Sequence, residues 1–269
     1  MEQLGFSGDA IIVEHDTVIK ICQTNQKRFI KNINKQKSFH NQYIQAVPII
    51  EAGLIDGKNF IRMPRLKCDN AIVWISRVSL DMVNEFIDRL EQYFTTLIDN
   101  SEMRKFDYEP WINKIEELEK KINDNDMLYV LTYLKQLKFS NAFYYGTSHG
   151  DLTLTNIFVS SDNDAISIDA IDFLDTFIES PIQDVVKLRQ DSFHLFTINI
   201  MHDTTKVDHN RVMIMLGYMD RRIEKLIQFN TVLNEYYVPF QLLNLLRIVP
   251  YSNDERILNY IKREIASIL

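Results

Sequence analysis

The sequence predicts an α+β fold in which a small antiparallel sheet at the N-terminus is followed by a larger, mostly helical region. Two observations predict this division. Before residue 65, short β-branched runs alternate with glycine-containing turns, which is typical of hairpins. After residue 65, apolar residues recur at three- and four-residue steps, as in amphipathic helices. We therefore expect two domains, residues 1–65 and residues 66–269.

Composition and charge narrow the class of protein. Of 269 residues, 46% are hydrophobic, which is enough for a sizeable core. No apolar run approaches the roughly 18 residues of a membrane span, and the start of the chain lacks the features of a signal peptide. The net charge of −7 argues against a nucleic-acid partner, which would require a basic stripe. We expect a cytoplasmic protein with no membrane partner, and the sequence leaves its oligomeric state open.

The first 65 residues contain a glycine-rich turn and a lysine-bearing strand. Gly5, Ser7 and Gly8 lie in the turn directly before the alternating run 10–14, and glycines there let backbone N–H groups approach a phosphate. An ordinary hairpin turn is the simpler alternative. The next strand, 17–21, carries Lys20 among apolar residues, where an unpaired lysine would be costly.

The remaining elements follow from periodicity and turn residues. Residues 26–46 are expected to be helical, with Phe29, Ile30 and Ile33 on one face. Strands are expected at 47–54 and 59–63 around the Asp56-Gly57 turn, with Pro64 ending the sheet. Further helices are expected at 80–97, 111–122, 128–137, 185–200, 207–229, 238–248 and 254–268, with a loop at 203–209.

The most informative stretch begins at His149-Gly150-Asp151. Asn156 follows Asp151 by five positions, so the two side chains can converge from one tight loop. Two β-branched runs then flank the polar turn 160–164, and folding this hairpin brings Asp172 back beside Asn156. These groups suit phosphoryl transfer: Asp151 would orient a hydroxyl and accept its proton, while Asn156 and Asp172 would bind Mg²⁺.

Asp169 and Asp175 are alternative metal ligands near Asp172. Alternation along a regular strand places Asp169 and Asp172 on opposite faces. Asp172 would then return to the apolar face of Ile168 and Ala170, where a carboxylate requires a strong partner such as a metal ion. We therefore favour Asp172.

The pattern His-x-Asp-x-x-x-x-Asn matches the catalytic loop of kinases, with Gly150 where protein kinases carry Arg. With Ile171-Asp172-Phe173 and the later Ser180-Pro181 and Asp184, residues 145–184 resemble the aminoglycoside phosphotransferase and choline kinase group of small-molecule kinases. In that group a second Asp, here Asp184, braces the metal-binding loop. The resemblance implies transfer of the γ-phosphate of ATP, or of GTP, to a small-molecule hydroxyl with Mg²⁺.

The resemblance also implies a two-lobed protein-kinase-like fold. Residues 1–65 would form the nucleotide-binding lobe, and residues 66–269 the catalytic and acceptor-binding lobe. Lys20 would contact the phosphates, and residues 63–66 would form the hinge that receives the adenine. The implied nucleotide-binding residues are Gly5, Ser7, Gly8, Lys20, Met63 and Arg65.

One departure from the family pattern leaves alternatives open. Kinases usually hold the lysine with a helix Glu, but residues 21–45 contain no acid. Gln36 could accept from Lys20, or the phosphates alone could hold it. The departure favours a non-catalytic nucleotide-binding relative, whereas intact Asp151, Asn156 and Asp172 favour an enzyme. A protein kinase is disfavoured by Gly150 and by the short segment after Asp172. An aminoglycoside, a sugar and an amino alcohol all remain candidate acceptors.

Overall fold

The computed structural model describes residues 2–4, 8–139, 142–162, 165–200 and 207–269. The chain divides into two compact units. The first contains residues 1–93 and 149–175, and the second contains residues 94–148 and 176–269. The lobe boundary expected at residue 65 divides the chain once along the sequence, whereas each compact unit consists of two separate segments. The expected boundary therefore stays a prediction.

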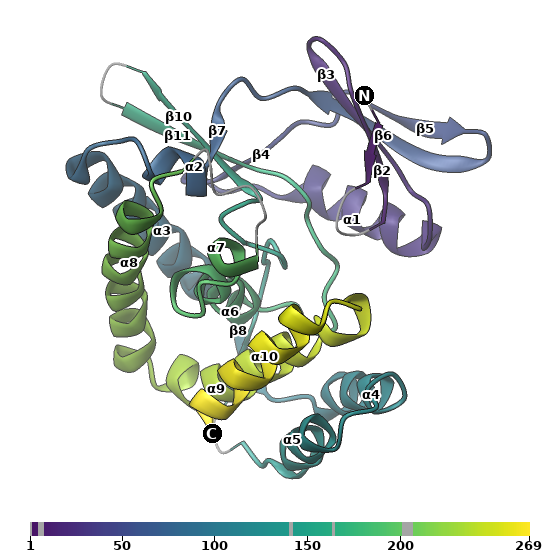
Figure 1. Cartoon of the computed structure of the whole chain (residues 1–269), viewed down its shortest axis with the longest axis vertical. Helices are drawn as coiled ribbons and strands as arrows, with labels where there is room; N and C mark the ends of the chain where they lie inside the picture. Colours follow the sequence, from purple (N-terminus) through teal and green to yellow (C-terminus); the bar gives the residue numbers. More distant parts are fainter. Residues whose placement is uncertain (1, 5–7, 140–141, 163–164, 201–206) are drawn as a thin grey trace. The chain divides into compact units, whose positions relative to one another are not determined.

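The first unit contains the expected N-terminal antiparallel sheet (Figure 1). Its strand order is β1-β2-β3-β6-β5. The bounds are β1 (Glu2–Leu4), β2 (Ala10–Val13), β3 (Thr17–Ile21), β5 (Glu51–Ile55) and β6 (Lys58–Pro64). Asp56 and Gly57 connect β5 to β6 with φ values of 51° and 76°, so the Asp-Gly pair forms the predicted two-residue hairpin.

Helix α1 (Gln26–Ser38) is shorter than the sequence predicts. Asn25 caps it by accepting the backbone N–H of Arg28. The prediction of a helix to residue 46 is wrong because Phe39 is already extended and Gln45–Ala46 forms strand β4, paired in parallel with Asp169–Ala170. Ile30, expected on the buried face, is instead 44% exposed.

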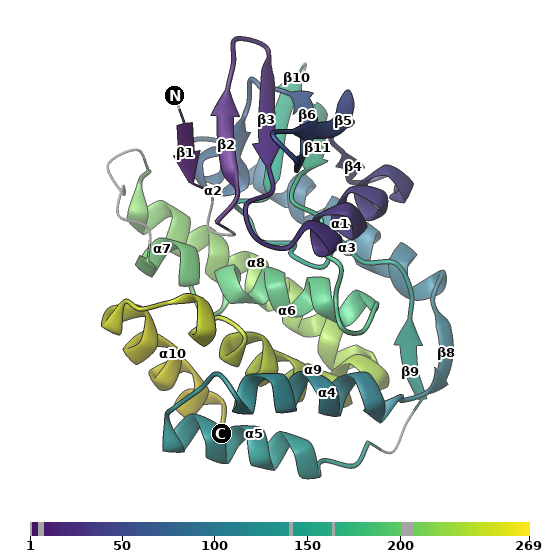
Figure 2. The same ribbon diagram turned by 90° about the vertical axis from the view of Figure 1, so that its right-hand side faces the viewer.

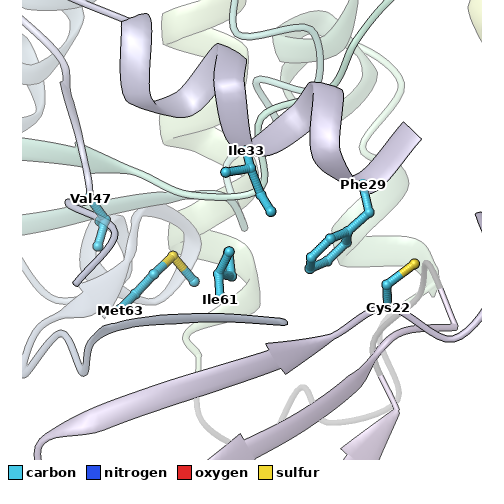
Figure 3. Close-up of a cluster of buried hydrophobic side chains, with 6 residues drawn as sticks. All are labelled: Cys22, Phe29, Ile33, Val47, Ile61 and Met63. Carbon is cyan, nitrogen blue, oxygen red and sulfur yellow. The ribbon is translucent and has the colours of Figure 1, made fainter. Parts of the chain in front are cut away.

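A hydrophobic cluster joins α1 to the sheet (Figure 3). Gln36 lies on the same helix face and donates from Nε2 to the Val47 carbonyl at 2.7 Å and to Met63 Sδ at 3.3 Å. The Gln36 side chain is buried and its amide group has hydrogen-bond acceptors. Because hydrogen bonds are directional, they orient α1 in a contact that is otherwise apolar. The cluster members are Cys22, Phe29, Ile33, Val47, Ile61 and Met63.

The predicted hairpin after Asn156 is present as β10 (Ile157–Asp162) and β11 (Ala165–Ala170). Ile157 pairs with Ala170, and β11 buries alternate residues, as the sequence predicts. A four-stranded sheet of order β4-β11-β10-β7 results. The two-residue strand β7 (Asp69–Asn70) and the short helix α2 (Ala71–Ile75) were not predicted.

Helix α3 (Leu80–Asp99) contains the last residues of the first unit's N-terminal segment and the first residues of the second unit. The second unit is otherwise mainly helical. In it α4 and α5 lie side by side, and α6, α8 and α9 pack together (Figure 2). The helices are α4 (Tyr108–Glu119), α5 (Asn125–Gln136), α6 (Pro181–Ser192), α7 (Phe196–Ile200), α8 (His209–Phe229), α9 (Thr231–Leu246) and α10 (Glu255–Ile268). No helix among the described residues is long and apolar enough to cross a membrane.

Three details of the second unit differ from the sequence prediction. The helix expected at 185–200 is divided into α6 and α7, because Leu195 between them has a φ of 55°. Helix α9 begins at Thr231 and contains Pro239, which the sequence analysis placed near a helix start. A hairpin of β8 (Glu102–Lys105) and β9 (Ala142–Tyr145) was not predicted. Most of the loop expected at 203–209 lies outside the described residues.

A buried ion pair joins α6 to α8. The Arg189 guanidinium donates to both carboxylate oxygens of Asp220, at 2.8 and 2.9 Å. Ser192 Oγ also donates to Asp220, at 3.0 Å. The Arg189 side chain is only 5% exposed, so burying its charge would be costly without the Asp220 carboxylate.

We expect Asp220→Ala to lower the free energy of unfolding by about 3 kcal/mol, because it leaves the Arg189 charge buried without its carboxylate. Arg256→Ala is the control, since the Arg256 side chain is 63% exposed and its loss should cost less than about 1 kcal/mol. Urea unfolding followed by circular dichroism measures both values. Equal destabilisation by the two variants would contradict this interpretation.

Candidate active site

The loop before β10 holds Asp151 and Asn156 together. Gly150 has a φ of 87°, a conformation that favours glycine, and it directly precedes Asp151. The Asp151 carbonyl accepts the Thr153 N–H at 2.8 Å, and the Thr153 carbonyl accepts the Asn156 N–H at 3.0 Å. Asn156 Nδ2 then donates to the Asp151 carbonyl at 2.9 Å and to Asp151 Oδ2 at 3.2 Å. The convergence predicted from their spacing is therefore confirmed.

His149 links this loop to the end of β11. Its Nδ1 accepts the Asp151 N–H at 3.2 Å, so Nε2 carries the proton that is donated to the Ile171 carbonyl at 2.7 Å. The ring is fully buried and lies against Phe173, with ring centroids 4.2 Å apart. From the sequence alone, His149 is only one residue of the His-Gly-Asp motif. In the fold it sets the distance between the two loops that carry Asp151 and Asp172.

Asp172 lies beyond the end of β11 in a left-handed conformation. Its φ is 61°, so the expectation that it returns to the apolar face by strand alternation is wrong. The preceding N–H, from Ile171, donates to the Asn156 carbonyl at 3.0 Å, which confirms that the hairpin returns the chain to Asn156. The strong partner expected for the Asp172 carboxylate is Lys20, whose Nζ donates to Oδ1 at 2.9 Å.

Lys20 is the buried cation of the site. Its side chain on β3 is 13% exposed, and Nζ lies 2.9 Å from Asp172 Oδ1 and 3.7 Å from Asp9 Oδ2. Burial by itself lowers the pKa of Lys20, but the charges of Asp172, Asp9 and Asp151 outweigh it and raise the pKa overall. Lys20 is therefore held protonated among three carboxylates.

The alternative partner for Lys20 considered from the sequence was Gln36, and this alternative is wrong. Gln36 donates instead to Val47 and Met63 within the hydrophobic cluster. Sequence reasoning also missed Asp9. The available signal was its position directly after the glycine-rich turn and one residue before β2, the strand that pairs with β3.

The other two candidate metal ligands have different surroundings. Asp175 pairs with Lys31 Nζ at 3.0 Å, and its backbone N–H donates to Asn32 Oδ1 at 2.8 Å. Asp169 lies on the opposite face of β11 from the buried residues, and burial raises its pKa. Asp172 is therefore the aspartate of the three that lies against Lys20.

The predicted nucleotide-binding residues are only partly described. Gly5 and Ser7 lie outside the described residues, while Gly8 has a φ of 77°. The Met63 side chain is buried in the hydrophobic cluster, so only its backbone is available to a base. Arg65 donates from its guanidinium to the Glu14 carbonyl at 3.3 Å. A cavity of about 520 Å³ beside it is lined by His15, Arg65, Leu66, Lys67, Cys68 and Asp69.

The donor atoms of Asn156 and Asp172 are of the kind that a magnesium ion prefers. Within the part of the chain that the structure describes, no three His, Cys, Asp or Glu side chains gather as a metal site. Mg²⁺ in phosphoryl-transfer enzymes usually takes one or two protein oxygens and completes its shell with phosphates and water. Asp172 offers carboxylate oxygens, and Asn156 offers its side-chain carbonyl because its amide nitrogen is engaged by Asp151.

No family model matches this sequence, and no curated protein matches it. Solved structures resemble it in fold. One is a thermostable mutant of the aminoglycoside phosphotransferase APH(4)-Ia, with a TM-score of 0.56 and 12% identity over 100% of this chain and 90% of that chain. Another is a choline/ethanolamine kinase family protein from Mesorhizobium loti, with a TM-score of 0.50 and 10% identity over 100% of this chain and 86% of that chain. The chain therefore has the protein-kinase-like fold of the aminoglycoside phosphotransferases and choline/ethanolamine kinases, as residues 145–184 predict.

Proposed function

We propose that this protein is a small-molecule kinase that transfers the γ-phosphate of ATP or GTP to a hydroxyl group. The observation that carries the proposal is the connection of Asp151 to Asp172. Asn156 and His149 each bind the Asp151 segment, and each also bonds to Ile171, next to Asp172. A proton acceptor and a metal-binding carboxylate are thereby held in one rigid arrangement, which phosphoryl transfer requires.

Each side chain has a distinct role in this proposal. Asp151 aligns the acceptor hydroxyl and receives its proton as the oxygen attacks phosphorus. Asn156 and Asp172 hold Mg²⁺, which neutralises charge on the phosphates. Lys20 contributes its positive charge to the same phosphates. This charge is available at neutral pH because neighbouring carboxylates raise the pKa of Lys20.

The rest of the nucleotide site is proposed from the same fold. Gly8, together with Gly5 and Ser7 of the turn expected from the sequence, would cover the phosphates with backbone N–H groups. The Met63 backbone and Arg65 would flank the base at the hinge. The acceptor would be an aminoglycoside, a sugar or an amino alcohol.

A non-catalytic nucleotide-binding protein is the second candidate. It is favoured by the 2.9 Å pair between Lys20 and Asp172, because this pair occupies two groups that catalysis requires for phosphate and metal. The intact Asp151–Asn156 contact favours the enzyme. Only turnover separates the two functions.

We expect the protein with Mg²⁺ and ATP or GTP to phosphorylate at least one member of a panel of aminoglycosides, sugars and amino alcohols. Release of nucleoside diphosphate and the mass of the phosphorylated product measure the reaction. Hydrolysis without a phosphorylated product would not count as transfer. Nucleotide binding without turnover on any acceptor would favour the non-catalytic function.

We expect Asp151→Asn to lower kcat by on the order of 10²-fold or more, because the amide cannot accept the hydroxyl proton. The variant keeps an oxygen that can accept from Asn156, so the nucleotide Kd should stay the same. Steady-state kinetics and calorimetric titration measure the two quantities. Near-normal turnover would remove Asp151 from the mechanism.

We expect Asp172→Ala to abolish the Mg²⁺-dependent part of nucleotide binding, because the variant removes a metal ligand. Asp169→Ala is the matched control, because Asp169 lies within β11 on the face opposite its buried residues, and this variant should leave the binding nearly unchanged. Titration of nucleotide with Mg²⁺ and with a chelator measures the Mg²⁺-dependent part. A larger effect of the Asp169 variant would reverse the metal assignment.

A further inference from the structure

A second carboxylate approaches Lys20 from the glycine-rich turn. Asp9 Oδ2 lies 3.7 Å from Lys20 Nζ, and the Asp9 side chain is only 11% exposed. Its other oxygen, Oδ1, accepts the Gln23 N–H at 3.3 Å. Because Gly8 takes a φ of 77°, the chain turns directly before Asp9 and continues into β2. Asp9 therefore lies directly before β2 and is held by Gln23, which follows the end of β3, the strand that carries Lys20.

The proposed function removes the nearer partner of Lys20. When Asp172 binds Mg²⁺ and Asp151 faces the acceptor hydroxyl, Lys20 loses both carboxylates as partners, although its side chain is only 13% exposed. A buried ammonium group without a carboxylate is costly. Residues 21–45 offer none, because they contain no Asp or Glu. Asp9 already lies within 4 Å of the ammonium group.

Helix α1, which follows the strand that carries Lys20, makes polar contacts to the segment after Asp172. Lys31 of α1 pairs with Asp175 at 3.0 Å, and Lys35 Nζ donates to the Leu174 carbonyl at 2.8 Å. Both contacts lie just after Asp172. Helix α1 therefore holds the segment next to the proposed metal ligand, and it has no side chain of opposite charge for Lys20.

We infer that Asp9 is the positioning residue that holds Lys20 toward the nucleotide phosphates once Asp172 binds the metal. The inference rests on the proposed function and adds to it a residue that exchanges partners with Asp172. Lys20 pairs mainly with Asp172 before nucleotide binds and with Asp9 afterwards. Since Asp9 directly follows Gly8, it also links Lys20 to a residue proposed to contact the phosphates.

The test compares Asp9→Asn with Asp56→Asn. The Asp9→Asn variant retains an oxygen that can accept the Gln23 N–H, so the substitution removes charge with little change in volume. Asp56 lies in the β5–β6 turn of the same sheet, and asparagine tolerates its φ of 51°. We expect Asp9→Asn to raise the Kd of Mg·ATP, or of Mg·GTP, about tenfold, as for a lost bond between charged groups. Asp56→Asn should leave the Kd unchanged.

A double-mutant cycle with Lys20→Ala separates positioning from a structural role. If Asp9 acts through Lys20, Asp9→Asn should not weaken binding further in the Lys20→Ala background. Asp9→Glu should restore most of the affinity, because it restores the charge. The unliganded melting temperature of Asp9→Asn should stay close to that of the wild type, because Asp172 still pairs with Lys20.

The outcomes distinguish the inference from the proposed function. If the wild-type chain binds neither Mg·ATP nor Mg·GTP, the proposed function fails and the inference fails with it. If the wild type binds and Asp9→Asn matches the Asp56→Asn control, only the inference is overturned. An Asp9→Asn effect that persists in full without Lys20 would also overturn it, because Asp9 would then act on the fold and not on the lysine.

Discussion

The buried positive charge of Lys20 is the constraint on which the candidate site depends. Three carboxylates reach its neighbourhood from different segments: Asp9 before β2, Asp151 in the loop before β10, and Asp172 after β11. The carboxylates repel one another, and the lysine would be costly to bury alone. The ammonium group and the three carboxylates compensate one another's charge. The site therefore forms only when the fold brings all of these segments together.

The surrounding contacts are made largely to backbone atoms, which fixes the segments as well as the side chains. His149 bonds to the backbone of Asp151 and Ile171. Further along the chain, Asn32 and Lys35 of α1 bind the backbone just after Asp172. A loop held at both ends in this way can place a carboxylate accurately without being part of a strand or helix.

Local spacing made part of the site predictable. The Asp151–Asn156 contact closes within one loop, and the β10–β11 hairpin pairs neighbouring segments, so both follow from the sequence. The end of α1 does not, because β4 pairs with Asp169–Ala170 far along the chain. The pairing of Lys20 with Asp172 could not be predicted from the sequence either. It depends on the left-handed backbone of Asp172, which strand alternation cannot anticipate for a residue other than glycine.

The first unit is assembled from two separate parts of the chain, residues 1–93 and 149–175. During synthesis, β4 and β7 emerge well before the β10–β11 hairpin that pairs with both of them. The early segment therefore cannot complete its second sheet until residue 170 has been made, and such long-range pairing slows folding. An excised fragment ending at residue 93 would lack two strands of that sheet. Dissection of the protein must carry residues 149–175 along with the N-terminal segment.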